Sequence, residues 1–170
     1  GGERPRVAIG AARFDLDGRG VWLVSDAGGE FQQLRHIDLE SGATRSFSEF
    51  LPWDVEDFDL GADGRYLAYA ANVDGTSRLT VIDLGNASEI VVRGLPAGAL
   101  LGDLRFDRGG HRLGLTIESA QQPRDAYTYD VDKAELVRWT RSESGPVDPA
   151  RFVAAQLVRF PTWDRVRTGE

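Results

Sequence analysis

The chain has 170 residues, of which 41% are apolar and 28% charged, a balance that excludes a disordered chain. No apolar run approaches the roughly 20 residues that a membrane-spanning helix needs, so no membrane partner is expected. The net charge of −7 is spread along the sequence, which argues against a nucleic-acid partner, because phosphate binding relies on clustered Lys and Arg. The absence of cysteine excludes disulfides, thiolate zinc sites and cysteine nucleophiles.

The first residues give a hint about the origin of the chain. It opens at Gly1-Gly2 and contains no Met, which is typical of a segment of a longer protein that has lost its start and any targeting signal. The compartment is therefore not fixed by the sequence. We expect a soluble protein, with a cytoplasmic location favoured and a periplasmic one as the alternative.

The first predicted unit covers about residues 6–50. Its strands are expected at 6–14, 21–25 and 34–37, with a short outer strand at 45–47. The segments between them are rich in Asp, Gly and Ser, which favour turns because they tolerate positive φ or bond to their own backbone. The unit therefore has the pattern of a four-stranded antiparallel meander.

Two further units repeat this pattern. In the second, about residues 51–97, strands are expected at 55–60, 65–71, 79–84 and 89–92. In the third, about residues 98–140, they are expected at 100–106, 112–117, 127–131 and 136–139. A longer turn from Glu118 to Asp125, containing Pro123, is expected within the third unit.

A shared motif relates the three units. Phe14, Phe58 and Phe106 each precede an Asp and a Gly-containing turn, and lie 44 and then 48 residues apart. The Asp of a closing strand follows each Phe after 24 or 25 residues, at Asp38, Asp83 and Asp130. A period of 40 to 50 residues made of short strands is the signature of a β-propeller blade. The sequence therefore predicts an all-β partial β-propeller of three blades, in which the three Phe residues end the inner strands.

Large aromatic side chains fall on the predicted strands, at Trp22, Tyr66, Tyr69, Tyr127 and Trp139. Because blades stack on such residues, a core between blades is favoured over a ligand cage. Three blades do not close a ring, so two flanks are expected to be open and to carry apolar residues such as Trp22, Tyr66 and Leu115. Exposed apolar patches find partners, and self-association through the blade flanks is expected.

The tail differs from the blades and is interpreted as an exit segment, residues 141–170. A loop at 142–149, one helical turn at 150–155 and an extended piece at 156–160 are expected. The blades resemble the propeller repeats of TolB-like proteins and of prolyl oligopeptidase family serine peptidases. The runs Arg138–Glu143, Asp148-Pro149 and Leu157–Asp164 resemble the exit from the peptidase propeller. There the chain enters an α/β-hydrolase domain, often through an aromatic-Asp pair, here Trp163-Asp164, with Arg165 where a Gly usually follows.

This resemblance implies a non-catalytic propeller that screens and docks peptide substrates for an α/β-hydrolase domain of the same parent chain. The alternative is a TolB-like protein-binding propeller without catalysis. The residues themselves hold no G-x-S-x-G elbow. Gly75-Thr76-Ser77 is nearest, but Leu79 stands where the second Gly must be. His36 and His111 have no predicted nucleophile partner. No catalytic residue is expected in this segment, which is not an enzyme by itself, and its parent is expected to be a serine peptidase.

Two further patterns are interpreted as turns. Asp15, Asp17, Gly20 and Asp26 echo the spacing of a calcium loop, but Arg19 would oppose the cation. Asn86-Ala87-Ser88 fits a glycosylation acceptor, in a turn where Asn and Ser are expected in any case. We therefore expect neither a metal nor a cofactor.

Overall fold

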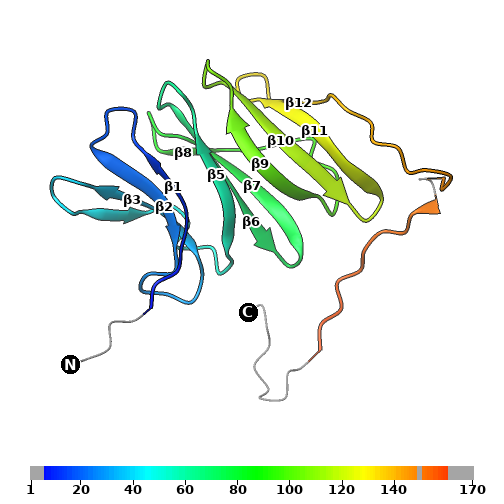
Figure 1. The fold of residues 1–170 in the computed structure, drawn as a ribbon, viewed down its shortest axis with the longest axis horizontal. Coiled ribbons are helices and arrows are strands. Elements are labelled where there is room, and N and C mark those ends of the chain that lie inside the picture. Colours follow the sequence, from blue (N-terminus) through cyan, green and yellow to red (C-terminus); the bar gives the residue numbers. More distant parts are fainter. Residues whose placement is uncertain (1–5, 149–150, 161–170) are drawn as a thin grey trace.

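The computed structural model describes residues 6–148 and 151–160, and its regular structure there consists of twelve β-strands in three separate sheets (Figure 1). Each sheet has four antiparallel strands in sequence order, so that each is a meander. The sheets stand beside one another like the leaves of a fan (Figure 1). The prediction of an all-β partial propeller is confirmed.

The strands of each sheet, here called a blade, have the following bounds. Blade 1 consists of β1 (Ile9–Phe14), β2 (Gly20–Ser25), β3 (Gln33–Asp38) and β4 (Thr44–Ser46). Blade 2 consists of β5 (Val55–Leu60), β6 (Tyr66–Val73), β7 (Thr76–Asp83) and β8 (Ser88–Ile90). Blade 3 consists of β9 (Leu100–Phe106), β10 (Arg112–Ser119), β11 (Gln122–Asp130) and β12 (Glu135–Arg138).

The prediction of a long turn at 118–125 is wrong. Strand β10 continues to Ser119 and β11 begins at Gln122, which leaves a tight turn of two residues. Pro123 lies near the start of β11, where the register with β10 shifts between Ile117 and Ser119. A proline is tolerated there because an irregular strand start does not need its missing N–H.

The assignment of Phe58 also needs correction. Phe14 pairs with Val21 and Phe106 with Leu113, but in blade 2 the residue at the strand end is Leu60, which pairs with Leu67. Phe58 therefore lies two residues before the end of its strand. The structural period is 46 residues in both steps, as the turn glycines Gly18, Gly64 and Gly110 also show, each with φ above +70°.

The hydrophobic core consists of two clusters, one between each pair of neighbouring blades. Trp22, Val24 and Leu34 of blade 1 pack against Phe58, Leu67 and Tyr69 of blade 2. Blade 2 contributes its opposite face to the second cluster, through Tyr66, Ala68 and Val81. There it meets blade 3, whose buried members are Leu104, Leu113, Leu115, Ile117, Tyr127 and Tyr129.

Trp22, Tyr66 and Leu115 are therefore not on the open flanks. All three lie between blades and are no more than 5% exposed. Of the five aromatic residues expected in the core, Trp139 is the exception, because it follows β12 and is 68% exposed. Its ring nitrogen donates to Thr128 Oγ1 at 2.8 Å on the outer side of blade 3. The other four are buried, but they do not occupy equivalent positions in the three blades.

Candidate functional site

A pocket of about 360 Å³ lies where the exit segment passes the ends of blades 1 and 2. The volume is within the range of small-molecule and side-chain binding pockets. Four segments supply its lining: the β2–β3 loop, the β4–β5 connection, the β6–β7 turn and the end of the exit segment. The lining residues are Glu30, Phe31, Pro52, Trp53, Asp74, Gly75 and residues 157–160.

The blade side of the pocket is held by hydrogen bonds between loops. Asp54 Oδ1 accepts the Gln32 N–H at 2.7 Å, and the Gln32 carbonyl accepts the Val55 N–H at 2.8 Å. These two bonds tie the β2–β3 loop of blade 1 to the start of β5 in blade 2. The loop that carries Phe31 is therefore fixed beside the connection that carries Trp53.

The β6–β7 turn is a two-residue hairpin turn. Asp74 and Gly75 have φ of 53° and 78°, the left-handed pair that fits the twist of a hairpin and that an Asp-Gly sequence favours. The Gly75 N–H also donates to Asn72 Oδ1 at 3.0 Å. The turn therefore presents the Asp74 carboxylate at the end of the blade, toward the exit segment.

The exit segment is held against the blade ends at three places. At its start, Asp125 accepts hydrogen bonds from Arg138, Thr140 and Ser142. Farther on, Gln121 in the β10–β11 turn donates to the Phe152 carbonyl at 3.2 Å. At its end, Arg159 Nη2 donates to Asp74 Oδ2 at 2.6 Å. The segment thus runs from blade 3 to the turn of blade 2, and Leu157 and Phe160 remain largely exposed beside the pocket.

Two of these anchors change the pKa of their charged groups. Burial raises the pKa of Asp125, but the hydrogen bonds from Thr140, Arg138 and Ser142 outweigh it and lower the pKa to about 2. The hydrogen bond and the charge of Asp74 raise the pKa of the Arg159 guanidinium. Both anchors therefore stay ionised across the ordinary pH range.

Part of the exit segment differs from the prediction. The helical turn expected at 150–155 is reduced to Arg151, whose N–H donates to the Asp148 carbonyl at 3.0 Å, and residues 152–160 have no regular structure. Pro149 and Ala150 lie outside the described residues. So do Trp163, Asp164 and Arg165, the residues that carry the resemblance to the entry into a hydrolase domain.

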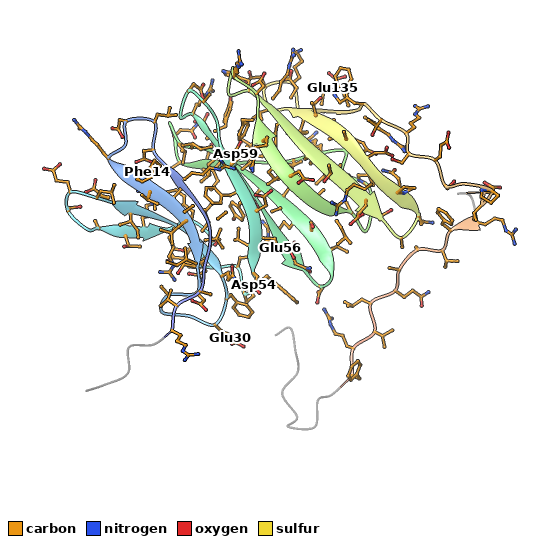
Figure 2. The ribbon with its side chains drawn as sticks, in the orientation of Figure 1. Phe14, Glu30, Asp54, Glu56, Asp59 and Glu135 are labelled. Atoms are coloured by element: carbon orange, nitrogen blue, oxygen red, sulfur yellow. The ribbon has the colours of Figure 1, made fainter. Side chains whose placement is uncertain are left out.

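The side chains that line the pocket are suited to binding a ligand rather than to catalysis. Three aromatic rings line it, and Asp74 is neutralised by Arg159. Glu30 is exposed and has no partner among the residues that the structure describes. Asp54 and Glu56 lie toward the same edge of the blades as Glu30 (Figure 2). The pocket and its surroundings therefore suit an apolar or aromatic group that carries or neighbours a positive charge.

The two histidines lie at the opposite ends of the blades, in carboxylate clusters. His36 Nε2 lies 2.8 Å from Asp15 Oδ2. His111 bridges blades 2 and 3, with Nδ1 at 2.8 Å from Asp132 and Nε2 at 3.4 Å from Asp63. The Tyr66 hydroxyl donates to Asp132 at 2.8 Å, and burial, followed by this bond, raises the pKa of Tyr66 to about 12.

The remaining candidates are dispersed by the fold. The three carboxylates of the calcium-like pattern have separate partners. Asp15 contacts His36, and Asp17 accepts the Arg19 N–H. Asp26 accepts the Ala8 N–H at the other end of the blade. Within residues 6–148 and 151–160, no group of three metal-ligating side chains is placed to hold a metal ion.

Asn86 and Ser77 have structural contacts. Asn86 Oδ1 accepts the Ser88 N–H and hydroxyl within the β7–β8 turn, which explains both residues of the glycosylation pattern. Ser77 lies in β7, and its hydroxyl accepts the Leu101 N–H at 2.9 Å. In the described part of the chain, no helix has the length and hydropathy to cross a membrane.

Solved structures share this fold, although no family model and no curated protein matches the sequence. Puromycin hydrolase superposes with a TM-score of 0.78 and 18% identity over 96% of this chain and 25% of its own. Prolyl endopeptidases reach a TM-score of 0.69 with 17% identity, covering 88% of this chain and 22% of theirs. TolB from Acinetobacter baumannii reaches 0.59 with 16% identity, covering 78% of this chain and 32% of its own.

These likenesses establish the fold. The chain is a segment of a β-propeller. It spans only about a quarter of the length of puromycin hydrolase, so the propeller segment resembles one part of a much longer protein. The pocket could not have been found from the sequence, because its lining comes from four separate segments whose proximity depends on how blades 1 and 2 stack.

Proposed function

We propose that this chain is the propeller part of a prolyl oligopeptidase-like serine peptidase, where it screens and docks peptide substrates. The hydrolytic chemistry is supplied by an α/β-hydrolase domain outside this sequence. The pocket beside the exit segment is the docking site, and a hydrophobic or aromatic residue of the peptide enters it.

One observation carries this proposal: the likeness to the peptidase extends beyond the blades. The blades from Ile9 to Arg138 make up about three quarters of the chain. The superposition on puromycin hydrolase covers 96%, so it includes most of the exit segment. The superposition on TolB covers 78%, which the blades alone can supply. The exit segment, which also completes the pocket, therefore favours the peptidase over a TolB-like binding propeller.

Peptide binding to the purified chain tests the proposal. Short peptides that contain Phe or Leu beside a free amino group are titrated, and binding is followed by calorimetry. Trp53→Ala should weaken binding about tenfold or more, because an aromatic wall of the pocket is removed. The matched control is Trp139→Ala, which removes an exposed Trp on the outer side of blade 3 and should leave binding unchanged.

The same preparation tests whether this chain binds peptides without hydrolysing them. The chain should bind such peptides without cleaving them, since the pocket lining contains no Ser or His side chain. Peptide cleavage that persists after further purification would contradict the proposal. So would equal loss of binding in the Trp53 and Trp139 variants, because the docking site would then lie elsewhere.

A further inference from the structure

One wall of the pocket is an arginine of the exit segment of the same chain. Arg159 Nη2 lies 2.6 Å from Asp74 Oδ2, and both residues line the pocket. The neighbours of Arg159 in the chain, Val158 and Phe160, are apolar and line the pocket as well. The exit segment therefore places a guanidinium flanked by apolar side chains against the blade ends, as a bound peptide can.

The Asp74 carboxylate is positioned by its own turn rather than by Arg159. The left-handed φ angles of Asp74 and Gly75 and the bond from the Gly75 N–H to Asn72 are local to the β6–β7 hairpin. The side chain of Asp74 is 36% exposed, so a cation from solution can reach it. A guanidinium suits this position, because its N–H donors match the two oxygens of a carboxylate.

The end of the exit segment is held loosely. The Arg159 side chain is 61% exposed, and an exposed ion pair contributes little stability because water competes for both charges. Leu157, Val158 and Phe160 are also largely exposed. Among the described residues, the pair with Asp74 is the one hydrogen-bonded contact of residues 153–160. This contact can therefore open while the blades stay folded.

A short tether keeps the loose contact occupied. The Phe152 carbonyl accepts a bond from Gln121, and Arg159 follows Phe152 by only seven positions. A short flexible tether gives an effective concentration on the order of millimolar. A peptide in solution must therefore compete with a tethered arginine for Asp74.

The rest of the lining also suits a cation. Arg159 is the one basic residue that lines the pocket, and Glu30 is a second acid beside Asp74. The rings of Phe31 and Trp53 line the same space, and aromatic faces attract a guanidinium. When Arg159 leaves, the lining therefore combines two carboxylates with aromatic rings.

We propose that Arg159 is an internal ligand of the pocket, and that a peptide with an arginine beside an apolar or aromatic residue takes its place on Asp74. The exit segment thereby inhibits the binding of such peptides until its end is displaced. The inference rests on the proposed docking function. It deepens that function by naming the guanidinium as the group that is selected and by assigning the inhibition to Arg159.

Calorimetry on the whole chain with two matched peptides tests the proposal. The first is Leu-Val-Arg-Phe, acetylated and amidated so that the guanidinium is its only charge. The second carries neutral citrulline in place of the arginine. In the wild type Asp74 is neutralised by Arg159, so the two peptides should bind similarly. In Arg159→Gln the preference for the arginine peptide should rise about tenfold, because the internal competitor is removed.

Asp74→Asn identifies the carboxylate that is responsible. This substitution keeps the turn, because Asn-Gly favours the same left-handed pair, but it removes the charge. In the Arg159→Gln background it should abolish the preference for arginine. The matched control is Arg78→Gln, which breaks an exposed ion pair with Glu89 between β7 and β8 and should bind both peptides as the wild type does.

The tether is tested by a variant outside the pocket. Gln121→Ala removes the bond to the Phe152 carbonyl and lengthens the free part of the exit segment. The effective concentration of Arg159 then falls, and the arginine peptide should bind about threefold more tightly than to the wild type. Unchanged affinity in Gln121→Ala would contradict the assignment of Arg159 as a tethered competitor.

The remaining outcomes separate this inference from the docking function. A preference for arginine that is as strong in the wild type as in Arg159→Gln would overturn the inference, as would one that survives Asp74→Asn. If Phe and Leu peptides bind through Trp53 while Arg159→Gln shows no preference for arginine, the inference fails and the docking function stands. If no peptide binds to the wild type or to Arg159→Gln, the docking function fails with it.

Discussion

The two contacts between blades differ in what they join. Between blades 2 and 3, Asp57 and Asp59 bind backbone N–H groups of β9, and the apolar cluster is the larger of the two. Between the inner strands of blades 1 and 2, an ion pair from Arg13 to Asp59 takes the place of these bonds, and the backbone of blade 1 bonds to blade 2 through Gln32 of the β2–β3 loop. A side-chain-to-backbone bond fixes the strand itself, whereas an ion pair fixes only two side-chain ends. The difference indicates that blade 1 is held to blade 2 less firmly than blade 3 is.

The largest effect is expected from cavities in the two clusters. Leu113→Ala in the cluster between blades 2 and 3 should lower the free energy of unfolding by about 3 kcal/mol, since Leu113 is fully buried. Leu34→Ala in the cluster between blades 1 and 2 should cost about 2 kcal/mol, because a less tightly held blade can partly close the cavity. Urea unfolding of both variants measures the difference, and equal losses would mean that the two contacts are equally rigid.

A smaller loss in the free energy of unfolding is expected from a substitution at Asp59, which contacts both blade 1 and blade 3. Asp59→Asn should cost about 2 kcal/mol, because a buried charge-assisted acceptor for the Phe106 N–H is weakened and the pair with Arg13 is lost. Asp57→Asn weakens the bonds from the Leu104 and Phe58 N–H groups but leaves the Arg13 pair in place, and should cost about 1 kcal/mol. Asp17→Asn, in an exposed turn, is the control. A larger loss for Asp57 than for Asp59 would show that the Arg13 pair adds nothing.

The smallest effect concerns the hydroxyl of Tyr66, whose bond to Asp132 crosses from blade 2 to blade 3. Tyr66→Phe should cost about 1 kcal/mol near pH 7. The pKa of Tyr66 is raised from 10 to about 12, so the folded state favours the neutral phenol. The stability that this provides is present below pH 10 and is lost as the pH rises from 10 to 12.

Unfolding as a function of pH checks this assignment. The wild type should lose more stability than Tyr66→Phe between pH 10 and 12. In this range the phenol of Tyr66 ionises readily in the unfolded chain but not in the folded one, and the Phe variant has no phenol at this position. Tyr127→Phe is a matched control, since Tyr127 is also buried in the same cluster. Parallel curves for the wild type and Tyr66→Phe would rule out Tyr66 as the source of the alkaline loss.

The residues of the turns and strands allowed much of the fold to be predicted. Asp-Gly pairs and alternating apolar residues located the hairpins, and the turn glycines at a spacing of 46 residues follow the true period. The Phe-Asp motif was misleading in blade 2, because Phe58-Asp59 lies two residues early. Phe58 packs in the core shared with blade 1, and Asp59 accepts a hydrogen bond from blade 3. Neither contact can be recognised from the order of residues along the chain.

The candidate site was not predictable in the same way. Trp53, Phe31 and Asp74 lie in separate loops that have no common motif, and the exit segment that covers them is irregular. The sequence does show a change of pattern after Trp139. That the segment then returns to Asp74 is decided by hydrogen bonds from Gln121 and Arg159 to groups far away in the chain.

The sequence by itself determined that the chain forms three antiparallel meanders, because turn chemistry and strand alternation act between residues close in the chain. Only the tertiary structure decided which faces are buried between blades, which side chains join the inner strands, and where the pocket lies. These features depend on residues one blade apart, about 46 positions, where no local preference acts. Asp59 illustrates this, since its role follows from Arg13 on one side and from the Phe106 N–H on the other.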